Sequence, residues 1–113
     1  MARVLVVDDD HLVREVVLEH LHNWPSWLGE SGTGGFQAYA VLTVSRAVAY
    51  LRTGHRLSKR QGAAWLAARS PAWRELIDWA STWWYADGTD DDHPPRSVRA
   101  FVEEMARDVP GTR

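Results

Sequence analysis

The sequence predicts an all-α fold: a single-domain bundle of about five helices over residues 1–113, with a short extended segment at its N-terminus. Three observations support this prediction. Apolar residues recur at helical spacing in several segments, and helix-capping residues stand at the start of those segments. Only the pentapeptide RVLVV, residues 3–7, has the composition of a strand. The 113 residues, of which 45% are hydrophobic, have the size and composition of one ordinary domain.

The first two helices are predicted from their apolar faces and flanking residues. The acids at positions 8–10 follow the extended segment and supply a helix cap and first-turn acids for a helix that ends at about Trp24. A glycine-rich loop covers residues 29–35. The second helix runs from about Phe36 to Arg52, and because it is apolar nearly all round, we expect it at the centre of the fold.

The remaining helices carry clear start signals. Ser58 and Gln61 match a capping box, which predicts a third helix that ends at about Arg69. Pro71 is expected at the first position of a fourth helix, because its fixed φ suits a helix start. The last helix is expected to begin near Ser97, with apolar residues at helical spacing after it.

Composition restricts the classes of function. The chain has no cysteine, which excludes disulfides, thiolate catalysis and cysteine-ligated zinc, and the histidines show no metal-ligand spacing, so we expect no metal site within the chain. The net charge of -2 means that any basic site is local. No signal peptide and no apolar run of transmembrane length is found, so the chain is predicted to be a soluble, cytoplasmic protein without a membrane partner.

A basic segment stands out at residues 53–65, TGHRLSKRQGAAW, which contains no acid. Lys59 and Arg60 occupy the first turn of the predicted third helix, where free backbone N–H groups and the helix dipole favour an anion. Arg46 lies in the middle of the apolar second helix, and a short turn at Gly54 brings the third helix back beside it. Arg46 and Lys59 are therefore expected to face one pocket.

A simpler interpretation of the same residues stays open. Lys59 and Arg60 can be solvated surface residues, as most charged side chains are. Arg46 can pair with an internal acid such as Glu19 or Asp78, because a charge in an apolar helix needs a partner.

Residues 39–71 resemble the C-terminal helical domain of streptomycin/spectinomycin (aminoglycoside) adenylyltransferases. The family pattern is a helix reading V-L-T-x-x-R, a T-G turn, S-K at the start of a helix with A-A-x-W, and a Pro-containing stop. The matching residues are Val41, Leu42, Thr43, Arg46, Thr53, Gly54, Ser58, Lys59, Ala63, Ala64, Trp65, Ser70 and Pro71. The spacing holds without a gap, and the remainder of the chain is similar only in its general helical layout.

The resemblance implies a role in a nucleotidyltransferase. In that family the helical domain forms one wall of a cleft in which ATP and the aminoglycoside bind, against an N-terminal nucleotidyltransferase domain. By resemblance, Lys59 contacts the phosphates of ATP, and Arg46 and Ser58 belong to the same nucleotide pocket. A lysine at a helix N-terminus stabilises the charge that grows on the leaving pyrophosphate.

The catalytic half of the family pattern is missing from this sequence. Family catalysis requires a Gly-Ser turn followed by an Asp-x-Asp pair that holds Mg²⁺, and the chain has no Gly-Ser dipeptide. Asp8 and Asp10, or Asp90 and Asp92, match the acid pair alone. We therefore assign no catalytic residue, expect the chain to be inactive alone, and expect ATP with Mg²⁺ only in complex with a separate nucleotidyltransferase domain. The chain could be a remnant of such an enzyme or a subunit that completes a separate nucleotidyltransferase domain. Its oligomeric state, monomer or homodimer, stays open.

The drug-binding position also departs from the family. Members that take streptomycin place an acid just before the second helix, whereas this sequence reads Gly35, Phe36 and Gln37 there. Gln37 and Glu30, the nearest acid, are the candidate substrate-binding residues, and the acceptor aminoglycoside stays open.

Three alternatives belong to other classes. A helical interaction module without a nucleotide role fits the same helices. The opening MARVLVVDDD resembles a response-regulator receiver, but residues 36–86 lack the alternating strands of that fold. A DNA-binding helix-turn-helix fits the outline of the second and third helices, yet GAAWLAA offers almost no base-reading side chains, so a nucleic-acid partner is not expected.

Overall fold

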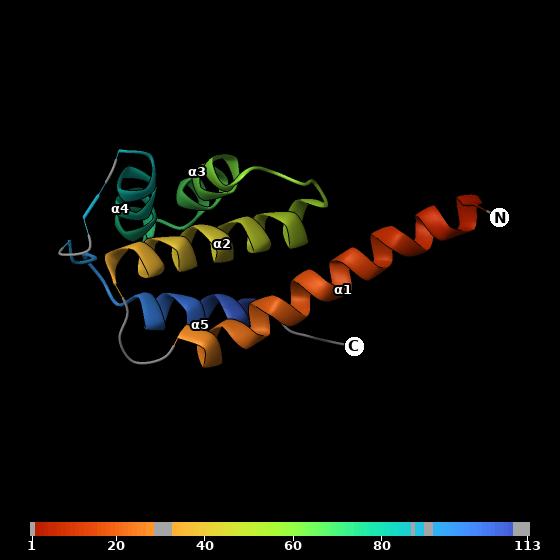
Figure 1. Cartoon of the computed structure of the whole chain (residues 1–113), viewed down its shortest axis with the longest axis horizontal. Helices are drawn as coiled ribbons and strands as arrows, with labels where there is room; N and C mark the ends of the chain where they lie inside the picture. The colour runs from red at the N-terminus through yellow and green to blue at the C-terminus, as the bar shows by residue number, and fades with distance from the viewer. Residues whose placement is uncertain (1, 29–32, 87, 90–91, 110–113) are drawn as a thin grey trace.

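A computed structural model describes residues 2–28, 33–86, 88–89 and 92–109. It contains five helices, which are α1 (Ala2–Leu28), α2 (Gly34–Thr53), α3 (Lys59–Arg69), α4 (Arg74–Tyr85) and α5 (Val98–Asp108) (Figure 1). No strand occurs among the residues it describes. The predicted all-α class and the five helices are confirmed.

Helix α2 is the centre of the bundle, as its apolar composition predicts. It packs against each of the other four helices, while α1 also packs on α5 and α3 on α4 (Figure 1). Buried positions occur along its whole length, and they are Gly34, Ala38, Ala40, Val41, Leu42, Val44, Ser45, Val48, Ala49 and Leu51. Helix α2 is therefore the apolar central helix of the fold, and the other four helices surround it.

Helix α1 corrects the predicted N-terminal segment. The extended stretch expected at residues 3–7 is helical, and the acids at positions 8–10 lie inside α1 rather than at its start. A lone strand has no neighbour to pair with, whereas a helical segment without Gly or Pro, such as residues 2–24, gains one hydrogen bond for each residue it adds. The helix also passes Trp24 and Pro25 to end at Leu28. Its N-terminal half projects beyond the bundle, which gives the molecule extents of 52 × 25 × 23 Å (Figure 1).

Local caps fix the turn that precedes α3. The side chain of Ser58 accepts a hydrogen bond from the Gln61 backbone N–H, and the Gln61 side chain accepts one from the Ser58 N–H, both at 3.0 Å. This confirms the predicted capping box. Gly54 ends α2 with φ 78°, a left-handed conformation that strains residues with a Cβ atom. This is the conformation expected of a glycine that ends a helix, as the sequence predicts.

The start of α4 differs from the prediction. Pro71 is not its first residue, because residues 70–73 form a turn in which the Trp73 N–H donates to the Ser70 carbonyl at 3.0 Å. The helix begins at Arg74. Burial of Trp73, which is 4% exposed, holds this turn against the core, so tertiary packing outweighs the local preference of proline for a helix start.

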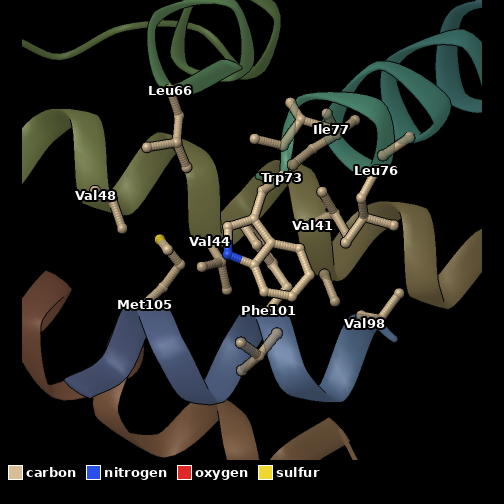
Figure 2. Close-up of a cluster of buried hydrophobic side chains, with 14 of the residues drawn as sticks. Val41, Val44, Val48, Leu66, Trp73, Leu76, Ile77, Val98, Phe101 and Met105 are labelled. Atoms are coloured by element: carbon tan, nitrogen blue, oxygen red, sulfur yellow. The ribbon is translucent and has the colours of Figure 1, made fainter. Parts of the chain in front are cut away.

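The main core lies where α2, α4 and α5 meet (Figure 2). Phe101 of α5 is fully buried, and its ring meets that of Trp73 edge-on, with centroids 5.4 Å apart and an interplanar angle of 68°. Val44 of α2 and Ile77 of α4 are also buried in this cluster. Val98, Phe101, Val102 and Met105 are the buried residues of α5, as its helical spacing predicts.

Helices α2 and α3 come very close together at Gly62. A Cβ atom at Gly62 would lie 2.7 Å from the Cα atom of Arg46 and 3.2 Å from its backbone nitrogen. Only a residue without a side chain allows the two backbones to come so close. This contact sets α3 across the middle of α2, and it places the start of α3 beside the face that carries Arg46.

Candidate functional site

A cavity of about 410 Å³ lies between α1, α2 and the start of α3, and we call it the α1–α2–α3 cavity. Its walls combine an apolar floor with polar and charged groups. The lining residues are Val13, Val17, His20, Leu21, Trp24, Tyr39, Thr43, Arg46, Ala47, Tyr50, Arg56, Leu57 and Lys59. A mostly apolar hollow with a few converging polar groups is the usual form of a small-molecule site.

The charges that the described residues bring to this cavity all have one sign. Arg46, Arg56 and Lys59 are cations, His20 can become one, and none of the described lining residues is a carboxylate. Several like charges around one concave surface raise the local potential and attract an anion. The cavity is therefore suited to a polyanion such as a chain of phosphates.

Lys59 stands at the first position of α3. Its Nζ atom lies 5.4 Å from the centroid of the Tyr39 ring, so a cation–π contact holds the ammonium at the cavity wall. The side chain is half-buried, and the free N–H groups of the first turn of α3 lie near it. A helix dipole and a lysine at one end of the cavity both favour negative charge there.

Arg46 lines the same cavity from the middle of α2, and its side chain is exposed. The alternative pairing with Glu19 or Asp78 is not found. Within the part of the chain that the structure describes, Arg46 has neither an ion pair nor a hydrogen bond. Its guanidinium is thus available to a ligand.

The other candidate site residues lie elsewhere. Ser58 does not line the cavity, and its hydroxyl serves the capping box of α3. Gln37 is half-buried in the first turn of α2 and also lies outside the cavity wall. Glu30 falls outside the residues that the structure describes. Arg60 stacks on the Tyr85 ring at 4.1 Å and does not line the cavity.

An exposed aromatic surface borders the cavity, and we call its residues Trp27, Phe36, Tyr39 and Trp84 the aromatic face. The buried Trp24 connects them, with ring centroids 5.7 Å from Trp27 and 6.0 Å from Phe36. Tyr39 continues the surface to Trp84 at 5.9 Å. Large aromatic side chains gathered on a surface are typical of binding interfaces.

Sequence reasoning did not place several residues in the cavity. Trp24 and Tyr39 come from helix positions that carry no motif, and only the crossing of α1 and α2 brings them and His20 to Lys59. Thr43 belongs to the V-L-T-x-x-R pattern, and its hydroxyl oxygen is buried without a hydrogen-bond partner among the described residues. A buried hydroxyl without a partner is uncommon, and it lies beside this cavity.

The described part of the chain shows neither a metal-binding cluster nor a membrane-spanning helix. No group of three or more His, Asp or Glu residues there is placed to hold a metal ion. None of its helices is both long enough and apolar enough to cross a bilayer.

The fold and the site together define an all-α domain whose first three helices enclose a cationic cavity. The family model for the aminoglycoside adenylyltransferase C-terminal domain matches residues 3–108. The chain belongs to this family, which confirms the resemblance seen over residues 39–71 and extends it to nearly the whole sequence. No curated protein and no solved structure matches the chain.

Proposed function

We propose that this chain provides the nucleotide-binding wall of an aminoglycoside adenylyltransferase-type enzyme. The α1–α2–α3 cavity holds the triphosphate of ATP while AMP is transferred to an aminoglycoside hydroxyl. The observation that carries this proposal is the set of three cationic side chains around one cavity, with no carboxylate among its described lining residues. The reaction in this proposal, AMP transfer to an aminoglycoside, is inferred from membership of the adenylyltransferase family.

The cavity residues have distinct tasks in this proposal. Lys59 neutralises phosphate charge at the N-terminus of α3, where the backbone N–H groups add to its effect. Arg46 offers a planar guanidinium from the neighbouring helix, which suits two phosphate oxygens at once. Positive groups already fixed in place stabilise charge that develops on the pyrophosphate leaving group.

The metal-dependent chemistry belongs to a separate nucleotidyltransferase domain in this proposal. Mg²⁺ bound with ATP would neutralise the phosphates and needs carboxylate ligands on that domain. The aromatic face borders the cavity and is the surface we expect that domain to cover. The aminoglycoside, a polycation, would enter between the two domains near Gln37 and Glu30.

We expect the chain alone to show no AMP transfer to streptomycin or spectinomycin in the presence of ATP and Mg²⁺. Asp8 and Asp10 lie in helix α1, and the sequence has no Gly-Ser turn before them to complete the metal-binding pattern of the family. The measurement is transfer of labelled AMP by the purified chain. Activity that disappears on Asp8→Asn or Asp10→Asn would show that the chain carries its own metal pair.

Lys59→Ala should weaken the binding of ATP and pyrophosphate by about 1–3 kcal/mol, or roughly 5- to 150-fold, because it removes one charge-assisted contact. Isothermal titration calorimetry with the whole chain measures this loss. Arg69→Ala is a matched control, since it removes the same charge from the last residue of α3, where Arg69 stacks on Trp65 outside the cavity.

Two results would contradict the nucleotide role. One is equal affinity in Lys59→Ala and Arg69→Ala, which would leave only a general charge effect. The other is an absence of ATP and pyrophosphate binding at millimolar ligand. Either result would favour a helical interaction module, whose binding surface would then be the aromatic face.

A further inference from the structure

We propose that His20 is a further anion-binding residue of the α1–α2–α3 cavity, and that it takes up a proton when a polyphosphate binds. The inference rests on the proposed function and deepens it, because it makes phosphate affinity depend on pH. It concerns α1, a helix that lies outside the 39–71 stretch on which the resemblance to the family rests.

The position of His20 supports a role in the cavity. Among the described side chains, helix α1 contributes five lining residues, of which His20 is the one with an ionisable side chain. The imidazole is exposed, and it meets the Trp27 ring edge-on with centroids 5.3 Å apart. This contact with the aromatic face holds the ring at the same cavity that Arg46 and Lys59 line from α2 and α3.

The described groups that face His20 across the cavity are cationic or neutral. They come from α2, from the connection that follows it and from α3, and they are Tyr39, Arg46, Tyr50, Arg56 and Lys59. No described residue of α4 or α5 lines the cavity. Glu19, next to His20 on α1, lines a separate surface hollow with His22. A bound anion is therefore the counter-charge that an imidazolium in this cavity would meet.

The chemistry of histidine makes this contact sensitive to pH. An ordinary imidazole changes its charge near pH 6.5, whereas Arg and Lys stay charged far above that value. A bound polyanion favours the imidazolium, so a proton from solvent moves onto the free ring nitrogen as the phosphate binds. The contribution of His20 to the polyphosphate affinity should then be largest at low pH, where the imidazolium is available. It should fall as the pH rises.

The test is isothermal titration calorimetry of the whole chain with inorganic pyrophosphate, at about pH 5.5 and about pH 8. His20→Gln keeps a polar side chain at an exposed position but removes the titration. We expect the variant to bind roughly tenfold more weakly than wild type at the lower pH and almost equally at the higher pH. Pyrophosphate also changes its charge between these pH values, but it does so equally for both proteins. This effect therefore cancels in the ratio of their affinities at each pH. Buffers of different ionisation enthalpy should show greater proton uptake by wild type.

His22→Gln is the control for a histidine on the same helix. His22 is half-buried, its Nε2 atom lies 2.5 Å from the Val109 carbonyl oxygen, and it does not line the cavity. We expect it to leave the pH dependence unchanged. Equal binding by wild type and His20→Gln at both pH values, with Lys59→Ala still weakened, would overturn the role of His20 alone. Failure of wild type to bind pyrophosphate at either pH would overturn the phosphate site as well.

Discussion

Phe101→Ala is expected to lower the free energy of unfolding by about 3–5 kcal/mol, the usual cost of removing a large aromatic side chain from a core. Phe101 is fully buried, and its ring packs edge-on against Trp73 (Figure 2). The substitution loses the transfer free energy of the ring and leaves a cavity between α2, α4 and α5. Because a small domain has a total stability of only about 5–15 kcal/mol, much of it should be lost.

Urea denaturation followed by circular dichroism measures this effect, and the chain offers a matched control. Its only other phenylalanine, Phe36, is 37% exposed on the aromatic face. Phe36→Ala should cost about 1 kcal/mol, because it loses one ring contact with Trp24 and little burial. Equal losses in the two variants would mean that the core does not centre on Phe101.

Gly62→Val is expected to lower stability by about 3 kcal/mol, the upper part of the range for overpacking. Even a Cβ atom at this position would lie 2.7 Å from the Cα atom of Arg46. The obstacle is backbone, which cannot rotate aside as a flexible side chain can. Helices α2 and α3 must then separate, which also moves Lys59 away from the face that carries Arg46.

Ala64→Val in the same helix isolates the steric effect. Ala64 is exposed, so the variant should lose only the difference in helix propensity, about 0.5–0.7 kcal/mol. Thermal unfolding of both variants gives the comparison, and pyrophosphate affinity of Gly62→Val reports the displaced cavity wall. A Gly62→Val protein as stable as Ala64→Val would show that α3 does not cross α2 at this glycine.

The central and C-terminal helices could be predicted from the sequence because their signals are local. Ser58 and Gln61 exchange their capping hydrogen bonds within one helical turn. Gly54 adopts a left-handed conformation, which is accessible to it because glycine has no side chain. The burial pattern of α5, from Val98 to Met105, follows from residue spacing alone. The central place of α2 follows from its all-round apolar surface.

Local sequence signals predicted the wrong secondary structure at two places, where packing or the continuation of a helix determined the conformation. The apolar residues 3–7 read as a strand, yet α1 includes them, since no second strand is present in the described residues to pair with them. Pro71 reads as a helix start, yet the buried Trp73 keeps residues 70–73 in a turn. In both cases the deciding interaction involves a part of the chain that lies outside the local window.

The sequence by itself determined the number of helices, the capping box and basic start of α3, the expectation that Arg46 and Lys59 face one pocket, and the family to which the domain is similar. Only the tertiary structure added His20 of α1 to the cavity that Arg46 of α2 and Lys59 of α3 line. Their meeting depends on the angle at which the helices cross, and the contact of Gly62 with the backbone of Arg46 sets the crossing of α2 and α3. Helix crossing arises from the packing of residues far apart in the chain, so no spacing within a single helix encodes it.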